Sequence, residues 1–529
     1  MGSGGGSNVS SGSAGARTVR ETERKYEAAQ PLDDELVARL AAAAGCAAPA
    51  PPERFDLSAV YYDTPDLRLL ASRLTLRRRR GGSDAGWHLK LPAGPAGSDS
   101  RDEVRVPLGR HRTPPARLLA LSRAAHRDAP VAPVVALDTD RREWTLTDAA
   151  GHAVATVTDD RVTARTLSGE DSGDGDGDTE PLRWAEIEVE LAEHGGADAL
   201  DRIEEVLAAA GVHRSASASK LGRVLADRVP APPQRPVADA DASAGDVVLA
   251  YLAEQADAIR ATDPLVRRGI GEGVHDMRVA CRRMRSTLQT FRPLLDRART
   301  DDLVAELRWF AGELGGARDL EVQEERIGAA VAALPPELAV GPVAVRTTRF
   351  FAGRRAGAAD TAGAALDGDR YVALLDAVDA LLADPPLTER AAEPARTVLP
   401  QLLGRALRRT RAAYRAAHAV PPGPQRDEAV HDMRKAAKRL RYAAELAEPA
   451  LGRPATELRK AVKEVQELLG EHQDSVVARG LLLELGAGRG NGFAFGWLLR
   501  DEQARAERVE DDLDAAWKEL RRRARAVTG

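Results

Sequence analysis

Cysteine, aromatic residues and long apolar runs are scarce in this chain of 529 residues. Its two cysteines, Cys46 and Cys281, are far apart in the sequence, which excludes a disulfide framework and a thiolate metal site and fits a reducing cytoplasm. No run approaches the roughly 18 to 20 apolar residues of a membrane-spanning helix. The Gly- and Ser-rich residues 1–17 lack the basic and apolar regions of a signal peptide, so we expect a disordered tail there and no membrane association.

Charge, by contrast, is abundant and nearly balanced. Asp, Glu, Lys and Arg make up 30% of the chain while the formal net charge is only −5, so opposite charges can be sorted onto different surfaces. The length exceeds that of a single ordinary core and indicates two or three domains. Global charge therefore identifies no ligand, and only patterned charges within each domain are informative.

Short alternating segments fill the first part of the chain, from about residue 18 to 165. Apolar and polar residues alternate with period two between Gly, Pro, Asp and Ser, a pattern that predicts antiparallel strands. A Gly-, Asp- and Ser-rich run at 168–180 predicts a surface loop, followed by a last strand at 184–191 and a helix at about 198–210. The other predicted strands are 20–26, 59–63, 74–80, 86–91, 101–107, 141–147 and 153–158.

A proline-rich segment between residues 229 and 237 interrupts the pattern. Neither a helix nor a central strand tolerates this density of proline, so we predict a linker at 230–243 between an N-terminal domain (18–229) and a C-terminal domain (244–527). Beyond the linker, nearly the whole sequence is typical of long helices rich in Ala, Leu, Arg and Glu.

An internal repeat predicts how the helical half is built. The motif VHDMRVACRRMR at 274–285 recurs as VHDMRKAAKRLR at 430–441, and LGGARD at 314–319 recurs as LGEHQD at 469–474. Two copies at nearly constant spacing predict two homologous helical bundles, at about 244–385 and 396–527.

Charged residues share one face on several strands of the first domain. Glu21, Glu23 and Lys25 stand at i, i+2 and i+4, so on a strand all three side chains point the same way. The opposite faces carry mostly Val, Leu, Ile or Trp. The same alternation applies to Arg77 and Arg79, to Lys90, to Arg101, Glu103 and Arg105, and to Glu186, Glu188 and Glu190.

These charged faces admit two interpretations. On one strand, alternating Glu and Arg are usually the solvated face of a two-layer sheet. Five strands together favour a barrel with a charged interior and an apolar outside covered by helices, because an unpaired charge in an ordinary core is strongly destabilising. Such a tunnel suits a polyanion: Arg and Lys neutralise phosphate oxygens, and carboxylates hold a divalent cation that polarises a phosphoryl oxygen or activates a water.

Several motifs of this domain resemble the CYTH, or triphosphate tunnel metalloenzyme, family. They are Glu21-x-Glu23-x-Lys25, YYDTPDLRLLASRLTLRRR at 61–79, WHLK at 87–90 and EIEVE at 186–190. The resemblance covers about residues 19–229. It implies an α+β domain built as an antiparallel eight-stranded β-tunnel with flanking helices, Mg²⁺ or Mn²⁺ as cofactor, and substrates with a triphosphate group.

Carried over by position, the resemblance implies three sets of site residues. Lys25, Glu21 and Glu23 form the catalytic set, in which Lys25 also orders the attacking water. The metal ligands are Glu21, Glu23, Asp160, Glu186 and Glu188. The phosphate ligands are Arg77, Arg79, Lys90, Arg101, Arg141 and Lys220, the last in a Ser-Lys element typical of the family. Three alternatives stay open: Asp159 for Asp160, Glu190 among the carboxylates of the last strand, and Arg105 for Arg101.

Each copy of the helical repeat carries a basic stripe that is separate from its apolar face. At about 100° per residue, the apolar face collects Met277, Cys281, Met284, Leu288 and Phe291, and in the second copy Met433, Ala437 and Leu440. The stripe consists of His275, Arg278, Arg282 and Arg285, repeated as His431, Arg434, Lys438 and Arg441. One such stripe is usually a solvated face, but its duplication favours a positive groove. With few aromatic residues interleaved, the groove suits phosphate chains better than nucleic acid.

The repeated HDMR helices resemble the CHAD domain, a helical module that commonly follows a CYTH domain. The resemblance covers about residues 244–527 and implies an all-α domain of two pseudo-symmetric four-helix bundles that binds inorganic polyphosphate through the two stripes. We expect Asp319 and Asp474 to cap helices rather than to pair with stripe cations. We also expect His275 and His431 to bind phosphate rather than metal.

The combined hypothesis is a cytoplasmic enzyme, free or at polyphosphate granules. It is a metal-dependent inorganic triphosphatase whose helical domain binds polyphosphate, so its partners are inorganic triphosphate and polyphosphate, with no nucleic acid. Two alternatives remain: a non-catalytic protein that localises to polyphosphate, and a hydrolase of an organic triphosphate such as thiamine triphosphate. The presence of Lys25 and the carboxylates favours the enzyme.

Overall fold

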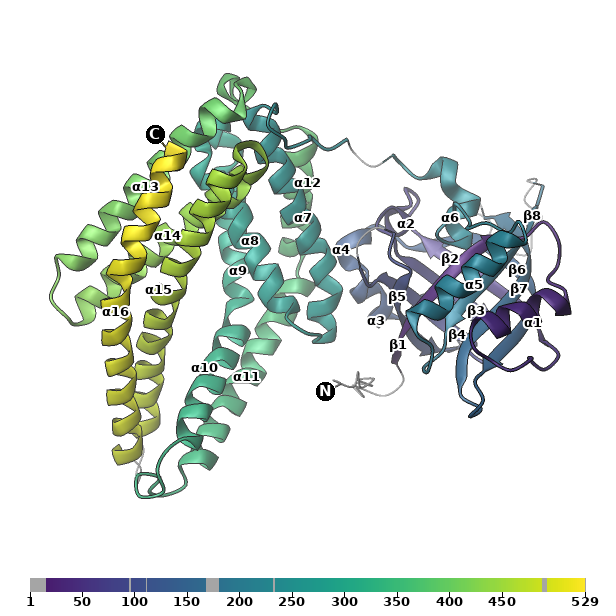
Figure 1. Ribbon diagram of the computed structural model, residues 1–529, viewed down its shortest axis with the longest axis horizontal. Coiled ribbons are helices and arrows are strands. Elements are labelled where there is room, and N and C mark those ends of the chain that lie inside the picture. Colours follow the sequence, from purple (N-terminus) through teal and green to yellow (C-terminus); the bar gives the residue numbers. More distant parts are fainter. Residues whose placement is uncertain are drawn as a thin grey trace. The chain divides into compact units, whose positions relative to one another are not determined.

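The computed structural model describes residues 16–94, 97–110, 112–167, 180–231, 234–487 and 492–528. The chain divides into two compact units, 1–232 and 233–529 (Figure 1). The loop predicted at 168–180, except its last residue, and the predicted tail up to residue 15 lie outside the described residues. Within these ranges, no helix combines the length and apolar character of a membrane span.

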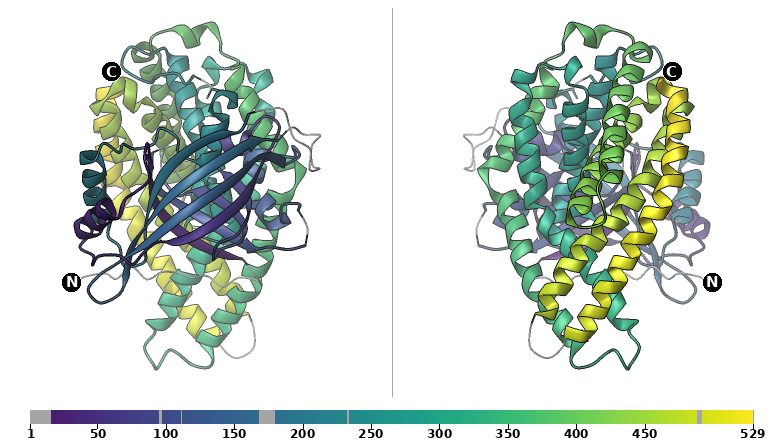
Figure 2. Two further views of the ribbon diagram at one scale, coloured as in Figure 1. Left: turned by 90° about the vertical axis from the view of Figure 1, so that its right-hand side faces the viewer. Right: turned by 90° about the vertical axis from the view of Figure 1, so that its left-hand side faces the viewer.

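Eight described strands of the first unit close into an antiparallel barrel, which confirms the predicted topology. The left view of Figure 2 shows the long strands of this barrel crossing at a steep tilt. Around the barrel the order is β1 (Arg17–Glu27), β5 (Ser100–Pro107), β4 (Gly86–Pro92), β3 (Thr75–Arg80), β2 (Glu53–Asp63), β6 (Ala132–Thr147), β7 (Ala153–Thr166) and β8 (Leu182–Leu191), which pairs again with β1.

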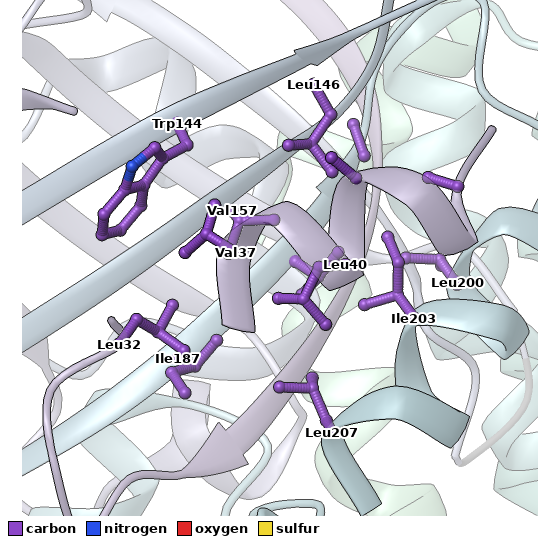
Figure 3. Close-up of a cluster of buried hydrophobic side chains, with 14 of the residues drawn as sticks. Leu32, Val37, Leu40, Trp144, Leu146, Val157, Ile187, Leu200, Ile203 and Leu207 are labelled. Atoms are coloured by element: carbon purple, nitrogen blue, oxygen red, sulfur yellow. The ribbon is translucent and has the colours of Figure 1, made fainter. Parts of the chain in front are cut away.

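Apolar side chains on the outside of the barrel pack under helices, as the alternating pattern predicts. Two helices, α1 (Asp34–Ala43) and α5 (Ala197–Ala209), cover β1, β6, β7 and β8. Figure 3 shows Leu40 of α1 and Ile203 of α5 gathered with Val157 of β7 in this cluster. The predicted helix at about 198–210 is α5, and its buried face places the hydrophobic core outside the barrel.

Shorter helices cover the other outer faces. Leu69 of α2 (Arg68–Ala71) and Leu118 of α3 (Ala116–Leu121) share a cluster with Trp87 and Leu89 of β4, and α4 (Arg123–His126) follows α3. Another helix, α6 (Lys220–Leu225), packs on β2, β6 and β7 through Leu221. The four short helices α1 to α4 were not predicted, because their apolar residues become helical faces only against the barrel.

Three strands are longer than predicted. β2 begins at Glu53 and β6 at Ala132, before the predicted starts at 59 and 141, and β7 continues to Thr166 beyond the predicted end at 158. The added residues pair with neighbouring strands, for example Glu53 with Glu143 and Thr139 with Val162. Backbone pairing extends a strand whether or not its side chains alternate, so the polarity pattern underestimated these strands.

The second unit is helical throughout its described regular structure, apart from short 3₁₀ turns, which confirms the predicted all-α character. The prediction of two pseudo-symmetric four-helix bundles remains a prediction. The helices are α7 (Ala244–Arg268), α8 (Gly273–Thr290), α9 (Asp301–Glu313), α10 (Gly315–Ala332), α11 (Val343–Asp367), α12 (Asp369–Ala383), α13 (Ala395–His418), α14 (Pro424–Leu451), α15 (Arg453–Gly486) and α16 (Gly492–Thr528).

The repeated motifs lie on corresponding helices. Both HDMR segments begin near the start of a helix, α8 in the first copy and α14 in the second, and these two helices contact each other. The second LGxxxD motif lies inside the continuous helix α15, whereas the first lies where α9 ends and α10 begins. The right view of Figure 2 shows α15 and α16 side by side as a long pair.

Candidate functional site

The barrel encloses a charged cavity of about 230 Å³. All eight strands contribute to its wall, because alternate residues of a strand point inward while their neighbours pack outward. On β1, Glu23 and Lys25 line the cavity, whereas Tyr26 lies in the outer apolar cluster. The charged lining residues are Glu21, Glu23, Lys25, Arg77, Arg79, Asp84, Lys90, Arg101, Arg105, Arg141, Glu143, Glu188, Glu190 and Lys220.

Most residues predicted for the tunnel meet in this cavity. The six predicted phosphate ligands and the three predicted catalytic residues all line it, as does Glu188. Asp160 and Glu186 are not part of its lining; they are buried at 0% and 2% exposure and contact Lys220. The predicted metal carboxylates are therefore distributed over the cavity wall and the layer behind it.

The structure shows where the alternatives that the sequence left open lie. Asp160 points inward, whereas the Oδ2 of Asp159 accepts a hydrogen bond from the backbone N–H of Leu32 at 3.2 Å on the outer side. Arg101 and Arg105 both line the cavity. Strand alternation alone predicts both outcomes once it is known which face of each strand is interior.

Two lysines of the cavity form ion pairs with carboxylates, Lys25 with β1 and β8 and Lys90 with β1. Lys25 Nζ contacts Glu188 and lies 3.3 Å from Glu23 Oε1, and Lys90 Nζ lies 2.8 Å from Glu21 Oε2. Burial alone would lower the pKa of Lys25, but Glu188 and Glu23 outweigh it and raise the pKa. In turn, burial would raise the pKa of Glu23, but Lys25 and Lys90 lower it to about 2. Both partners stay ionised at neutral pH, so Lys25 holds its proton.

A third lysine occupies a cluster of three carboxylates. Lys220 Nζ lies 2.6 Å from Glu186 Oε1, 2.8 Å from Glu188 Oε1 and 2.9 Å from Asp160 Oδ2. The three carboxylates offer ligand oxygens within 4.8 Å of one another, a spacing that suits a divalent cation. Arg141 also donates to Asp160, at 2.7 and 2.8 Å. Three of the five predicted metal ligands therefore lie together, and an ammonium group lies among them.

A second group of carboxylates consists of Glu190, Glu21 and Glu23, which all line the cavity. Burial, together with the negative charges of Glu21 and Glu23, raises the pKa of Glu190 to about 7. Like charges held this close are relieved by a bound cation. Carboxylate oxygens are the donors that Mg²⁺ and Mn²⁺ prefer, so this donor set fits either ion.

Guanidinium groups also form part of the cavity wall. Arg77 and Arg79 from β3 and Arg141 from β6 all line it. Burial and the charges of Arg77 and Arg141 lower the pKa of Arg79 to about 9. Cations crowded in this way favour an anion between them, and each guanidinium offers a fork that matches a phosphate.

Sequence reasoning assigned no role to a buried group next to these arginines. Glu103, fully buried, accepts from Arg77 Nη2 at 3.5 Å and from Arg105, and its Oε1 lies 3.1 Å from His88 Nδ1. Burial lowers the pKa of His88 to about 4, so the imidazole is neutral. His88 alternates with Lys90 on β4, and this spacing was the sequence signal that His88 points into the barrel. Glu103 and His88 together orient the neighbouring arginines.

In the helical unit, the predicted apolar faces are confirmed: Met277, Cys281 and Met284 are fully buried, as are Met433 and Leu440. The two basic stripes lie on other faces of the same two helices, α8 and α14. Among the described residues, no carboxylate forms an ion pair with Arg282, Arg285, Arg434, Lys438 or Arg441. The stripes therefore carry uncompensated positive charge.

Lys438 shows that the two stripes adjoin. Burial and the charges of Arg434 and Arg441 on its own helix, and of Arg282 and Arg278 on α8, lower the pKa of Lys438 to about 7. An interaction of this strength requires that the cations of both copies lie near one another. His431 Nδ1 lies 2.5 Å from Gln473 Oε1 of α15, which fixes the imidazole beside the stripe.

The expectation that Asp319 and Asp474 cap helices is wrong. Asp319 lies in the second turn of α10 and accepts from Arg278 at 3.0 and 3.2 Å, and Asp474 lies in the middle of α15. Burial raises the pKa of Asp474, and the charges of Arg434 and Lys438 oppose this shift. Neither carboxylate stands at a helix start, and each lies near cations of the stripes.

Two family models match this chain. The model described as CYTH domain matches residues 20–225, and the model described as CHAD domain matches residues 250–483. The chain is also 38% identical over 482 residues to the uncharacterized proteins MT2285 and Rv2226 from two strains of Mycobacterium tuberculosis. Each match covers 88% of this chain and 90% of the relative.

Among solved structures, PptA from Streptomyces chartreusis is similar to 52% of this chain over 100% of its own length, at 24% identity and a TM-score of 0.45. The CHAD domain from the plant Ricinus communis is similar to 55% of this chain over 96% of its own length, at 26% identity and a TM-score of 0.43.

Proposed function

This chain belongs to the proteins that join a CYTH domain to a CHAD domain, and from that premise we propose that its barrel hydrolyses inorganic triphosphate with a divalent metal while its helical unit binds polyphosphate. The observation that carries the proposal is the cavity wall itself. Cations from β1, β3, β4, β5, β6 and α6 and carboxylates that come mainly from β1 and β8 line one enclosed space together.

The cations would hold the substrate. Arg77, Arg79 and Arg141 offer bidentate donors to phosphate oxygens, and Lys90 and Arg101 add charge from β4 and β5. Glu103 and Asp160 fix Arg77 and Arg141 in place before any ligand arrives. A prepositioned set of donors stabilises the charge that develops on the transferred phosphoryl group.

The carboxylates that line the cavity on β1 and β8, namely Glu21, Glu23, Glu188 and Glu190, would hold Mg²⁺ or Mn²⁺. When bound, such an ion polarises a phosphoryl oxygen and lowers the pKa of a water molecule. Asp160 and Glu186 lie behind the lining and would act by holding Lys220. Lys25, which stays protonated, would donate to the substrate or orient the attacking water rather than remove its proton.

The unpaired stripe cations support polyphosphate binding by the helical unit. A linear phosphate chain carries charge along its whole length, so it can neutralise Arg282, Arg434 and Lys438 together. Few aromatic residues lie in the two repeated motifs, which leaves little for a nucleobase to stack on.

Phosphate release from tripolyphosphate tests the enzymatic half. The intact protein with Mg²⁺ or Mn²⁺ should release orthophosphate, chelation should stop the release, and Glu23→Gln should abolish it. Glu205→Gln changes an exposed glutamate of α5 in the same isosteric way and should have no effect. Metal-independent release, or full turnover by Glu23→Gln, would contradict the proposal.

One observation favours a non-catalytic alternative. The ammonium of Lys220 already lies among Asp160, Glu186 and Glu188, in the position that a metal would otherwise occupy. In that case the barrel would bind triphosphate tightly and release no phosphate with any divalent ion. A parallel assay with thiamine triphosphate and ATP separates an organic from an inorganic substrate.

A further inference from the structure

A second cavity adjoins the tunnel. Its volume is also about 230 Å³, and its wall shares Glu23, Lys25, Arg101 and Ala218 with the wall of the first cavity. The two cavities therefore meet at residues common to both, and the proposed catalytic Lys25 stands at this junction.

The second cavity has charged walls of its own. Two of its arginines are engaged: Arg24 donates to Asp99 and Glu204, and Arg214 donates to the same two carboxylates. The turn between α2 and β3 adds a further basic residue, Arg73, to this wall. The residues specific to this cavity are Arg24, Arg73, Gly97, Ser98, Asp99, Arg214, Ser215, Ala216 and Ser217.

Arg101 joins the two cavities. Its Nη1 donates to the backbone carbonyl of Arg73 at 3.0 Å, and among the described residues it has no carboxylate at ion-pair distance. Burial lowers the pKa of Arg101, Glu23 opposes this shift, and the positive charge of Arg73 adds to it. The side chain of Arg101 thus reaches the turn that carries Arg73, and both residues line the second cavity, where an anion would stabilise their positive charge.

The backbone holds Arg73 in an uncommon conformation. Its φ of 62° lies in the left-handed region, which residues with side chains rarely adopt. The turn is closed by hydrogen bonds from Arg73 N–H to the Leu70 carbonyl at 2.9 Å and from Leu74 N–H to the Leu69 carbonyl at 2.8 Å. Backbone conformations of this kind concentrate at functional sites.

We propose that the second cavity is a subsite for the phosphoryl units of a linear inorganic polyphosphate that extend beyond the three held in the tunnel. Arg73 and Arg101 bind their oxygens, and the hydroxyl of Ser217 donates an additional hydrogen bond. The inference rests on the proposed triphosphatase function and specifies its substrate: the enzyme favours tetrapolyphosphate and longer chains over tripolyphosphate.

The test compares kcat/KM for tetrapolyphosphate and tripolyphosphate in the full-length protein with Mg²⁺. Arg73→Gln removes the charge, and the carbonyl that Arg101 uses is retained. We expect it to lower kcat/KM for tetrapolyphosphate about tenfold, the effect of one charged hydrogen bond, and to leave tripolyphosphate within about twofold. Arg165→Gln, at an exposed arginine of β7, is the matched control and should change neither value.

A second variant keeps the test decisive if Arg73→Gln folds poorly. Ser217→Glu places a negative charge in the second cavity and should also reduce turnover of tetrapolyphosphate selectively. An equal loss on both substrates, or an unchanged ratio in both variants, overturns the subsite while the triphosphatase stands. If Arg73→Gln altered only inhibition by orthophosphate, the cavity would be a product exit and the proposal would be wrong. No release by the unmodified protein from either substrate overturns both proposals.

Discussion

In the barrel, Lys25, Lys90 and Lys220 each lie at ion-pair distance from two or three carboxylates, whereas Lys438 of the helical unit is surrounded by arginines and, among the described residues, has no carboxylate at ion-pair distance. The pKa of each barrel lysine is raised despite burial, while that of Lys438 is lowered to about 7. The same residue type is thus stabilised as a cation in one unit and destabilised in the other.

This contrast separates two ways of binding phosphate. A balanced cavity holds its charges in fixed positions without a ligand, and such preorganisation is what a chemical step requires. A surface with excess positive charge is stabilised by any polyanion that binds to it, and this attraction requires little precise geometry. Such a surface suits binding without chemistry. Four predictions test whether the contrast is real.

The largest effect is expected from Lys220→Met. It leaves Asp160, Glu186 and Glu188 close together without their shared cation, and loss of one partner from a buried ionic group costs about 3–5 kcal/mol of unfolding free energy. Denaturant unfolding of the barrel measures it. Lys463→Met, at an exposed lysine of α15, should have almost no effect. Mg²⁺ should restore part of the lost stability by replacing the ammonium; an unchanged midpoint would show that the cluster is not stabilised by Lys220.

Lys25→Met should lower kcat for tripolyphosphate by about a hundredfold or more, because it removes a charged donor at the reacting phosphoryl group. Phosphate release at saturating substrate measures this. The comparison variant is Lys438→Met, which removes a lysine from the other unit and should leave kcat unchanged. Equal effects from both variants would mean that the barrel is not the site of hydrolysis.

The double variant Arg282→Ala, Lys438→Ala should weaken polyphosphate binding about tenfold to a hundredfold at low salt, because two unpaired cations are lost. Binding titrations over a range of salt concentrations should also give a shallower dependence on log[salt]. The control, Lys463→Ala, removes a lysine that is paired with Glu467. Turnover of tripolyphosphate should be unaffected, and an unchanged salt dependence would exclude the stripes as the binding surface.

The smallest effect concerns pH. Lys438 is protonated below pH 7 and loses its proton as pH rises through its pKa of about 7, so polyphosphate affinity should fall severalfold between pH 6 and pH 8. Bound polyanion favours the charged form, so binding near pH 7 should take up protons, which calorimetry in buffers of different ionisation enthalpy detects. The groups that face Lys438 include Asp474, and burial raises its pKa. Lys438→Arg should keep the affinity and flatten its pH dependence; retained pH dependence would assign the titration to another group.

Much of the fold was predictable because its signals are local. Alternation on β1 and β8 identified charged faces, and proline density with helical periodicity separated the two halves. Strand ends were not predictable: β6 starts well before Arg141 because it pairs with β2 and β7. A helix such as α1 depended on contacts with residues distant in the sequence.

For the site, the sequence by itself determined which residue types alternate on which strand. Because side-chain direction along a strand has a period of two, this alternation was enough to predict most residues that line the cavity. Only the tertiary structure decided which cation meets which carboxylate: that Lys220 lies within Asp160, Glu186 and Glu188, that Glu103 holds Arg77, and that Lys438 faces Arg282. The physical reason is that Coulomb energies depend on distance and burial, and both are set by barrel closure and helix packing rather than by position in the chain.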